Sequence, residues 1–154
     1  MKLDRLDRAI LANLQENGRL TNVELADRVG LSPSACLRRV ALLEKTGVIS
    51  GYQAEINAAA LDYAVVVLVQ ITLSGQSAPI LRAFEAAVMK VPNLLACFLM
   101  AGAKDYILRI AARDVDDYGT IHTEYLSALP HVQSMESSFV LRTVVNRGFS
   151  VAAI

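Results

Sequence analysis

The chain has 154 residues, no formal net charge at pH 7 and an apolar fraction of 54%. This length fits one or two small domains with a real core, and no apolar run reaches the roughly 18 residues of a membrane span. The N-terminal stretch MKLDRLDRAIL carries acids inside its apolar pattern, unlike a signal peptide. The two cysteines form no CxxC pair and have no nearby histidine, so we expect no metal, no cofactor and a reducing cytoplasm.

Two short helices are predicted at the start of the chain. Apolar residues recur at helical spacing from Leu3 to Leu14, and the Asn-Gly pair at 17–18 ends this helix. Thr21 and Glu24 then form a capping box, which opens a second helix. Gly30 ends that helix, because glycine accepts the left-handed conformation that a sharp turn requires.

A third helix is predicted to begin after Ser32, with Pro33 at its first position, and to end near Lys45. At 100° per residue, its apolar side turns toward the other two helices. Cys36 lies on that side and is interpreted as a small core residue. The apolar side consists of Cys36, Val40 and Leu43, whereas Ser34, Arg38 and Leu42 point away from it, with Ala35 and Arg39 on the flank.

Two helices joined by so short a turn, the second led by polar and basic residues, are typical of a DNA-binding helix-turn-helix. Residues 1–50 carry a net charge of +2 and the remainder −2, which places the basic excess in this part of the chain. Taken alone, the arginine pair is equally compatible with a solvated helix face. The side chains predicted to meet base edges or phosphates are Ser32, Ser34, Ala35, Arg38, Arg39 and Lys45.

The rest of the chain changes to a β-rich pattern. The segment VISGYQAEI is predicted to form two short strands or one bent strand, and residues 57–62 a short linker. The later elements follow the order β-α-β-β-α-β, which is the ferredoxin-like plan. They are strands at 65–73, 94–100, 106–112 and 139–145, and helices near 77–91 and 114–129. The fold class is therefore α+β, with a helix-turn-helix domain at 1–50, a strand and linker at 51–64 and an αβ-sandwich at 65–154.

The first and last of these strands are apolar on nearly every residue. A small sheet with helices on one side should alternate instead, with polar side chains on its open side. We therefore expect another subunit to cover the second face of the sheet.

The chain resembles the Lrp/AsnC family, the leucine-responsive and asparagine-related transcription regulators of bacteria and archaea, also called feast/famine regulatory proteins. The matching text is LDRLDRAILANLQENGRLTNVELADRVGLSPSACLRRVALLEKTGVISGY and, later, AGAKDYILRI and LPHV, in the right order over nearly the whole chain. The resemblance implies a winged-helix-like N-terminal domain and a C-terminal αβ-sandwich, the regulation of amino acid metabolism (RAM) domain. It also implies dimers through the sheets, further assembly to tetramers, octamers or hexadecamers, and effectors, commonly amino acids, bound near interfaces between dimers.

The resemblance also assigns candidate effector-binding residues, in a loop after a glycine and in the last strand. These residues are Leu99, Gly102, Ala103, Lys104, Asp105, Tyr106, Ser137, Ser138 and Phe139. Asp105 could pair with an amino acid's ammonium, and Lys104 or backbone N–H groups near Gly102 with its carboxylate. The alternative is a plain hairpin turn, with Gly102 at positive φ.

The sequence departs from the family in this region. Ala103 stands where the family commonly has an acidic or bulky residue, and Ser137-Ser138 where it often has a threonine and an aromatic residue. The effector therefore need not be leucine or asparagine.

The leading hypothesis is a cytoplasmic, DNA-binding transcription regulator that recognises a pseudo-palindromic operator in double-stranded DNA and responds to a small effector. The resemblance implies that this effector is an amino acid. This regulator is expected to form a homodimer or a larger assembly such as a tetramer or octamer, without membrane contact. The alternative is a ligand-sensing oligomeric module with only weak or non-specific DNA binding. An enzyme is disfavoured, because the sequence presents no nucleophile–base pair, metal cluster or phosphate loop.

Overall fold

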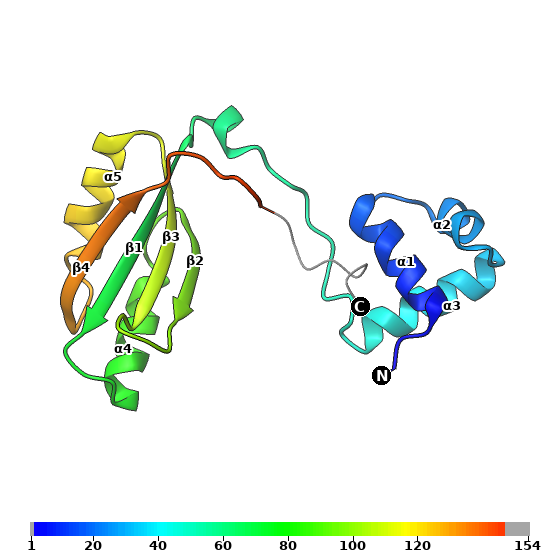
Figure 1. Ribbon diagram of the computed structural model, residues 1–154, viewed down its shortest axis with the longest axis horizontal. Coiled ribbons are helices and arrows are strands. Elements are labelled where there is room, and N and C mark those ends of the chain that lie inside the picture. Colours follow the sequence, from blue (N-terminus) through cyan, green and yellow to red (C-terminus); the bar gives the residue numbers. More distant parts are fainter. Residues whose placement is uncertain (1, 147–154) are drawn as a thin grey trace. The chain divides into compact units, whose positions relative to one another are not determined.

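The computed structural model describes residues 2–146, which divide into two compact units, one formed mainly by residues 2–55 and one by residues 56–144 (Figure 1). Each unit has its own buried hydrophobic cluster. None of the helices in the described part of the chain is long and apolar enough to cross a membrane.

The first unit contains the three predicted helices: α1 (Arg5–Glu16), α2 (Asn22–Val29) and α3 (Pro33–Lys45). Its core is formed by Ile10, Leu11, Leu25, Ala26, Cys36 and Leu43. Cys36 is fully buried, which confirms its interpretation as a core residue, and burial raises the pKa of its thiol.

Each of these helices begins with a side-chain cap. The predicted capping box of Thr21 is present on α2, and the Ser32 hydroxyl accepts a hydrogen bond at the start of α3. Asp4 and Asp7 form a second capping box on α1, which the sequence interpretation missed. Gly30 ends α2 in the left-handed region, with φ of 68°, so the predicted reason for a glycine at this turn is confirmed.

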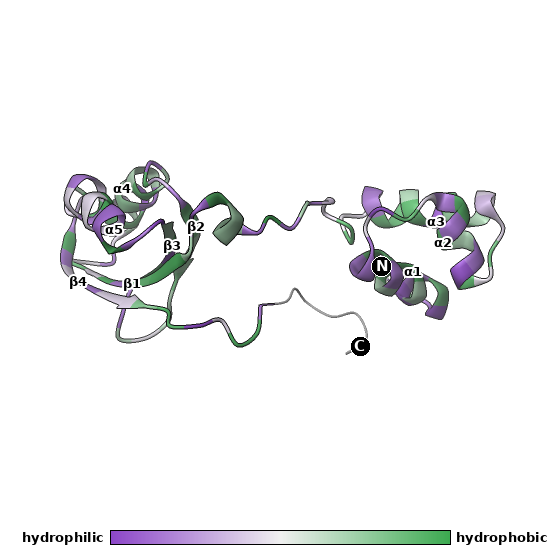
Figure 2. Cartoon of the chain, turned by 90° about the horizontal axis from the view of Figure 1, so that it is seen from above, coloured by the Kyte–Doolittle hydropathy of each residue, from purple (hydrophilic) through white to green (hydrophobic). Residues whose placement is uncertain are grey.

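The second unit is a four-stranded antiparallel sheet in the order β2-β3-β1-β4, with helices on one face (Figures 1 and 2). The predicted β-α-β-β-α-β order is confirmed. The elements are β1 (Val65–Leu73), α4 (Ala78–Val88), β2 (Leu94–Leu99), β3 (Tyr106–Ala112), α5 (Val115–Ile121) with a π-helix (His122–Leu126), and β4 (Val132–Phe139).

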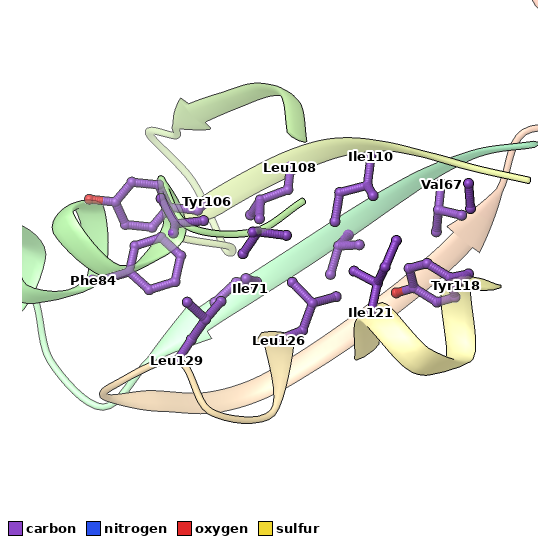
Figure 3. Packing of buried hydrophobic residues seen from close by; sticks show 14 of the residues in the cluster. Val67, Ile71, Phe84, Tyr106, Leu108, Ile110, Tyr118, Ile121, Leu126 and Leu129 are labelled. Atoms are coloured by element: carbon purple, nitrogen blue, oxygen red, sulfur yellow. The ribbon is translucent and has the colours of Figure 1, made fainter. Parts of the chain in front are cut away.

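The core of this unit lies between the sheet and its two helices (Figure 3). Alternate side chains of β1, from Val67 to Ile71, are fully buried and face α4 and α5, where Phe84 and Ile121 meet them. Leu68 points to the other face and is 37% exposed. Neither α4 nor α5 covers that other face, called here the outer sheet face.

Two strand predictions are wrong. Residues 48–56 contain no strand, because no neighbouring strand in the described residues pairs with this stretch, and isolated extended backbone is not a stable strand. The last strand runs from Val132 to Phe139 instead of 139–145. Its pairing ends where Val140 donates to the Val66 carbonyl, and β1 begins only one residue before Val66, at Val65. The start of β1 therefore sets the end of β4, although the β-branched residues in 140–145 favour a strand.

The helix predicted near 114–129 is not regular along its length, because α5 is followed directly by the π-helix. A regular helix over 114–129 would turn both Tyr125 and Leu126 partly inward. The π-helix adds a residue to the turn, so that Leu126 is fully buried and Tyr125 is 40% exposed.

Candidate DNA-binding surface and effector loop

The outward side of α3 is a continuous exposed stripe. Its members recur at positions i, i+3, i+4, i+7 and i+11, so they share one side of the helix. They are Ser34, Leu37, Arg38, Ala41 and Lys45, all exposed. Arg38 takes part in no ion pair within residues 2–146. Because Cys36 and Leu43 are sealed in the core behind it, α3 has one face for packing and one for a partner.

Local contacts fix the N-terminus of α3. The Asn22 side-chain amide, at the start of α2, donates to the Pro33 carbonyl at 2.8 Å, which ties the first turns of the two helices together. The Ser32 hydroxyl accepts from the Ala35 N–H at 3.3 Å and lies 3.3 Å from the Ser34 hydroxyl. Ser32 and Ser34 are exposed and Ala35 is half-buried, so the two hydroxyls are accessible at the positive end of the helix dipole.

Arg39 is held inside its own domain. Its Nη1 donates to Asp4 at 2.8 Å and to Asp7 at 2.7 Å, which joins α3 to the start of α1. These hydrogen bonds raise the pKa of Arg39, and the Asp7 backbone N–H together with Arg39 lowers that of Asp4. A guanidinium that already faces two carboxylates is a poor phosphate ligand. The structure therefore gives Arg39 a bracing position, unlike Arg38.

We expect Arg39→Ala to lower the thermal midpoint of the protein but to leave the salt dependence of DNA binding unchanged, because Arg39 releases no phosphate counterion. Lys45→Ala is the matched comparison and should reduce the slope of log K against log salt by about 0.9. Fluorescence anisotropy titrations at several salt concentrations measure both slopes. A loss of about one unit of slope in Arg39→Ala would show that Arg39 contacts phosphate after all.

The loop between β2 and β3 is anchored by its aspartate. Asp105 is only 6% exposed. Its carboxylate accepts from the Leu73 N–H and from the Gln76 side-chain amide, both at 2.7 Å. Its backbone bonds to Ile71 and Met100 complete the attachment, at 2.9 and 2.8 Å. The Asp105 carboxylate thus accepts a hydrogen bond that a neighbouring strand would otherwise accept. It does so where the register between β1 and β4 shifts, between Thr72 and Leu73.

The other loop residues are more accessible. Gly102 and Ala103 are exposed, and Lys104 lies 3.5 Å from Glu136 on β4. Among the described residues, the glycines with positive φ are Gly30, Gly47 and Gly51, so Gly102 does not serve the conformational role that the plain-turn alternative gave it. The loop reaches β4 through the Lys104–Glu136 ion pair.

Tyr106 belongs to the core rather than to the loop surface. It is 1% exposed, packs against Phe84 with ring centroids 4.5 Å apart, and donates its hydroxyl proton to Glu85 at 2.8 Å. Burial and the neighbouring Glu85 carboxylate raise the pKa of Tyr106. Because the Tyr106 hydroxyl is bonded to Glu85, its position does not support the predicted contact between Tyr106 and an effector.

The residues predicted on the last strand do not form one cluster. Ser137 and Phe139 face the helices, where both contact Tyr118, whereas Ser138 pairs with Leu68 on the outer sheet face. Phe139 pairs with Val67, four residues along β1 from Ile71, where the loop is attached. At about 3.3 Å per residue this is about 13 Å. Leu99, at the end of β2, is 58% exposed and lies beside the loop.

Four residues near these surfaces escaped the sequence interpretation. Leu37 and Ala41 complete the α3 stripe, and their helical spacing from Arg38 was the available signal. Gln76 and Glu136 contact the loop. They lie 29 and 32 residues from their partners, so no local pattern could reveal them.

The geometry defines a class of protein: a two-unit chain with a DNA-binding helix-turn-helix and a separate αβ-sandwich that carries a candidate ligand loop. Comparisons with known proteins agree. Residues 3–50 match the model of a winged helix-turn-helix DNA-binding domain, and residues 66–148 match that of the Lrp/AsnC ligand binding domain.

Curated relatives include the leucine-responsive regulatory proteins of Salmonella typhimurium and Escherichia coli. Each is 42% identical over 142 residues, which is 92% of this chain and 87% of the relative. A solved transcriptional regulator from Neisseria meningitidis, in complex with L-methionine, is similar with a TM-score of 0.89 and 36% identity, over 95% of this chain and 94% of that chain. An AsnC family regulator from Agrobacterium tumefaciens has a TM-score of 0.89 and 30% identity, over 94% of each chain.

The chain belongs to the Lrp/AsnC family of DNA-binding transcription regulators. The family identification and the α+β fold expected from the sequence are thereby confirmed.

Proposed function

We propose that this protein is a sequence-specific regulator that reads DNA with the exposed stripe of α3. The observation that carries the proposal is the division of α3 into a sealed apolar face and an exposed face with Arg38 and Lys45. In a major groove, Arg38 can fork onto guanine and Leu37 can contact a thymine methyl group. Ser32, Ser34 and Ala35, at the helix N-terminus, are the other proposed contacts.

The test is selection of a binding site from a random duplex library, followed by anisotropy titration at several salt concentrations. A regulator should prefer the selected site over scrambled DNA by at least about a thousandfold. Equal affinity for both sequences would favour the alternative, a ligand-sensing module with weak or non-specific DNA binding.

We propose residues 1–50 as the DNA-binding domain, 51–64 as the connection, and 65–154 as the effector and assembly domain. A cytoplasmic location and a role without catalysis follow from binding DNA as a regulator. The effector is proposed to be an amino acid, since one similar regulator was solved with L-methionine and the curated relatives are named leucine-responsive. A thermal-shift screen of the twenty amino acids would name it.

We further propose that two chains associate through the outer sheet face, and that such dimers can assemble further. The face presents Leu68, Phe98 and Ile107 as apolar side chains. Two recognition helices in one dimer would match a pseudo-palindromic operator.

We expect Leu68→Lys to weaken the dimer at least about tenfold, because it buries an unpaired charge in the proposed interface. The matched control is Met89→Lys. Met89 is exposed and lies at the C-terminal end of α4, so this substitution should leave association unchanged. Light scattering after size-exclusion chromatography gives the mass of each. Equal masses for Leu68→Lys and the unmodified chain at all concentrations would contradict an interface at this face.

A further inference from the structure

Asp105 is a buried carboxylate that forms no ion pair with any of the described residues. Within residues 2–146 its hydrogen-bond donors are neutral: the Leu73 N–H and the Gln76 amide. Lys104, the preceding residue in the chain, pairs with Glu136 instead. Buried carboxylates are normally paired with a positive charge, because removing an ionised group from water is costly. When no effector is bound, the negative charge of Asp105 is therefore only partly compensated.

The two donors differ in how readily they can leave. The Leu73 N–H is backbone at the end of β1, and Leu73 is 4% exposed, so breaking this bond would disturb the sheet. Gln76 is an exposed residue on the segment between β1 and α4. Its side chain can swing away by rotating single bonds, with no change in any strand. Only the Gln76 contact is easily exchanged.

We propose that Gln76 is an internal competitor for the effector: its amide occupies the Asp105 oxygen that the ammonium group of an amino acid takes when the effector binds. This inference rests on the proposed amino-acid effector function and adds a residue to it. An ammonium forms an ion pair with the carboxylate, whereas Gln76 offers it only a neutral donor, so the exchange is favourable. It also supplies the positive charge that Asp105 lacks.

The exchange has a structural consequence. While Gln76 holds Asp105, it joins the loop at 100–105 to the segment at 74–77, which leads into α4. Ser77, at the cap position of α4, makes no side-chain capping hydrogen bond, and the Ser74 N–H donates to the His131 carbonyl at 2.8 Å, outside the loop. The side chain of Gln76 is therefore the contact through which this segment reaches the loop. Displacing Gln76 releases the start of α4 from the loop. The effector thereby changes the surface next to its own site.

The test compares Gln76→Met, which keeps side-chain length but removes the donor, with the matched control Gln133→Met on an exposed position of β4. Isothermal titration calorimetry is run on the full chain with L-methionine and with L-leucine. If the closed contact leaves about one site in ten open, its loss should lower the Kd about tenfold. Gln133→Met should bind as the unmodified chain does.

4-(Methylthio)butanoic acid, which is methionine without its amino group, distinguishes competition from a general loosening of the site. Gln76→Met should gain nothing toward this compound, because it has no donor for the Asp105 oxygen that Gln76 leaves free.

Three results would overturn the inference in distinguishable ways. If the unmodified chain binds an amino acid but Gln76→Met binds it equally or more weakly, competition is wrong and the effector function stands. If Gln76→Met gains equally toward 4-(methylthio)butanoic acid, the contact restricts access to the site and does not compete for the Asp105 oxygen. If neither chain binds either amino acid at millimolar concentration, both the competition and an effector function at this loop for these two amino acids fail, while the DNA-binding test is unaffected.

Discussion

Arg38→Ala should weaken binding to the selected operator by about 1–3 kcal/mol and relax specificity at one base position, because a bidentate contact to guanine is lost. Arg38 is exposed and lies on the opposite side of α3 from Cys36, so its removal leaves the core of the domain intact. The thermal midpoint should therefore stay unchanged. Anisotropy titrations with the operator and with single-base variants measure the effect.

Arg82→Ala removes the same charge from the exposed side of α4 and serves as the control. Its operator affinity should match that of the unmodified protein. If Arg38→Ala binds the operator as tightly as the unmodified protein, Arg38 does not make the proposed contact. The main support for DNA recognition by this face of α3 would then be lost.

Asp105→Ala should destabilise the αβ-sandwich by about 2–4 kcal/mol, because the buried Leu73 N–H loses its acceptor and the Gln76 amide loses a charged partner. For a domain of this size the thermal midpoint should fall by at least about 8 °C. Hydrogen exchange at the Leu73 amide should accelerate as well. Circular dichroism and mass spectrometry provide the two measurements.

Asp116→Ala, at the exposed start of α5, is the matched acidic control and should change the midpoint little. If Asp105→Ala and Asp116→Ala melt together, the carboxylate of Asp105 is not the anchor that its hydrogen bonds indicate. Asp105→Asn retains an oxygen for the Leu73 N–H and should lie between these two variants.

The helix-turn-helix could be predicted because its signals are local. The Thr21–Glu24 capping box, the left-handed Gly30 and the Ser32 cap each act within a few residues of their position in the chain. Helical spacing alone identified Cys36 as buried. The outward stripe was also within reach, since Leu37 and Ala41 follow the same spacing as Arg38.

The candidate effector site was less accessible to the sequence, because its contacts join distant segments. Asp105 looks like a turn residue until the sheet places it beside Leu73 and Gln76, about thirty residues away in the chain. The last strand was misplaced for a related reason. Strand limits depend on how far the neighbouring strand extends, and β1 offers no partner beyond Val65.

Arg39 shows the same limit within the DNA-binding unit. Its helical position left it on the flank of the outward side, and only the fold brings Asp4 and Asp7 against it. Charge counting along the sequence treats all arginines alike. Which of them remain available to a partner is decided by contacts between α3 and α1.

The π-helix at His122–Leu126 has a consequence for variation in chain length. A single-residue deletion within these five positions would convert the π-helical turn into an ordinary α-helical one. Ile121 before the deletion and Leu126 after it could still reach the core. The same deletion inside α3 would rotate every later side chain by about 100° and bury the wrong ones. Gaps among homologues in the second half of the protein should therefore gather at this turn.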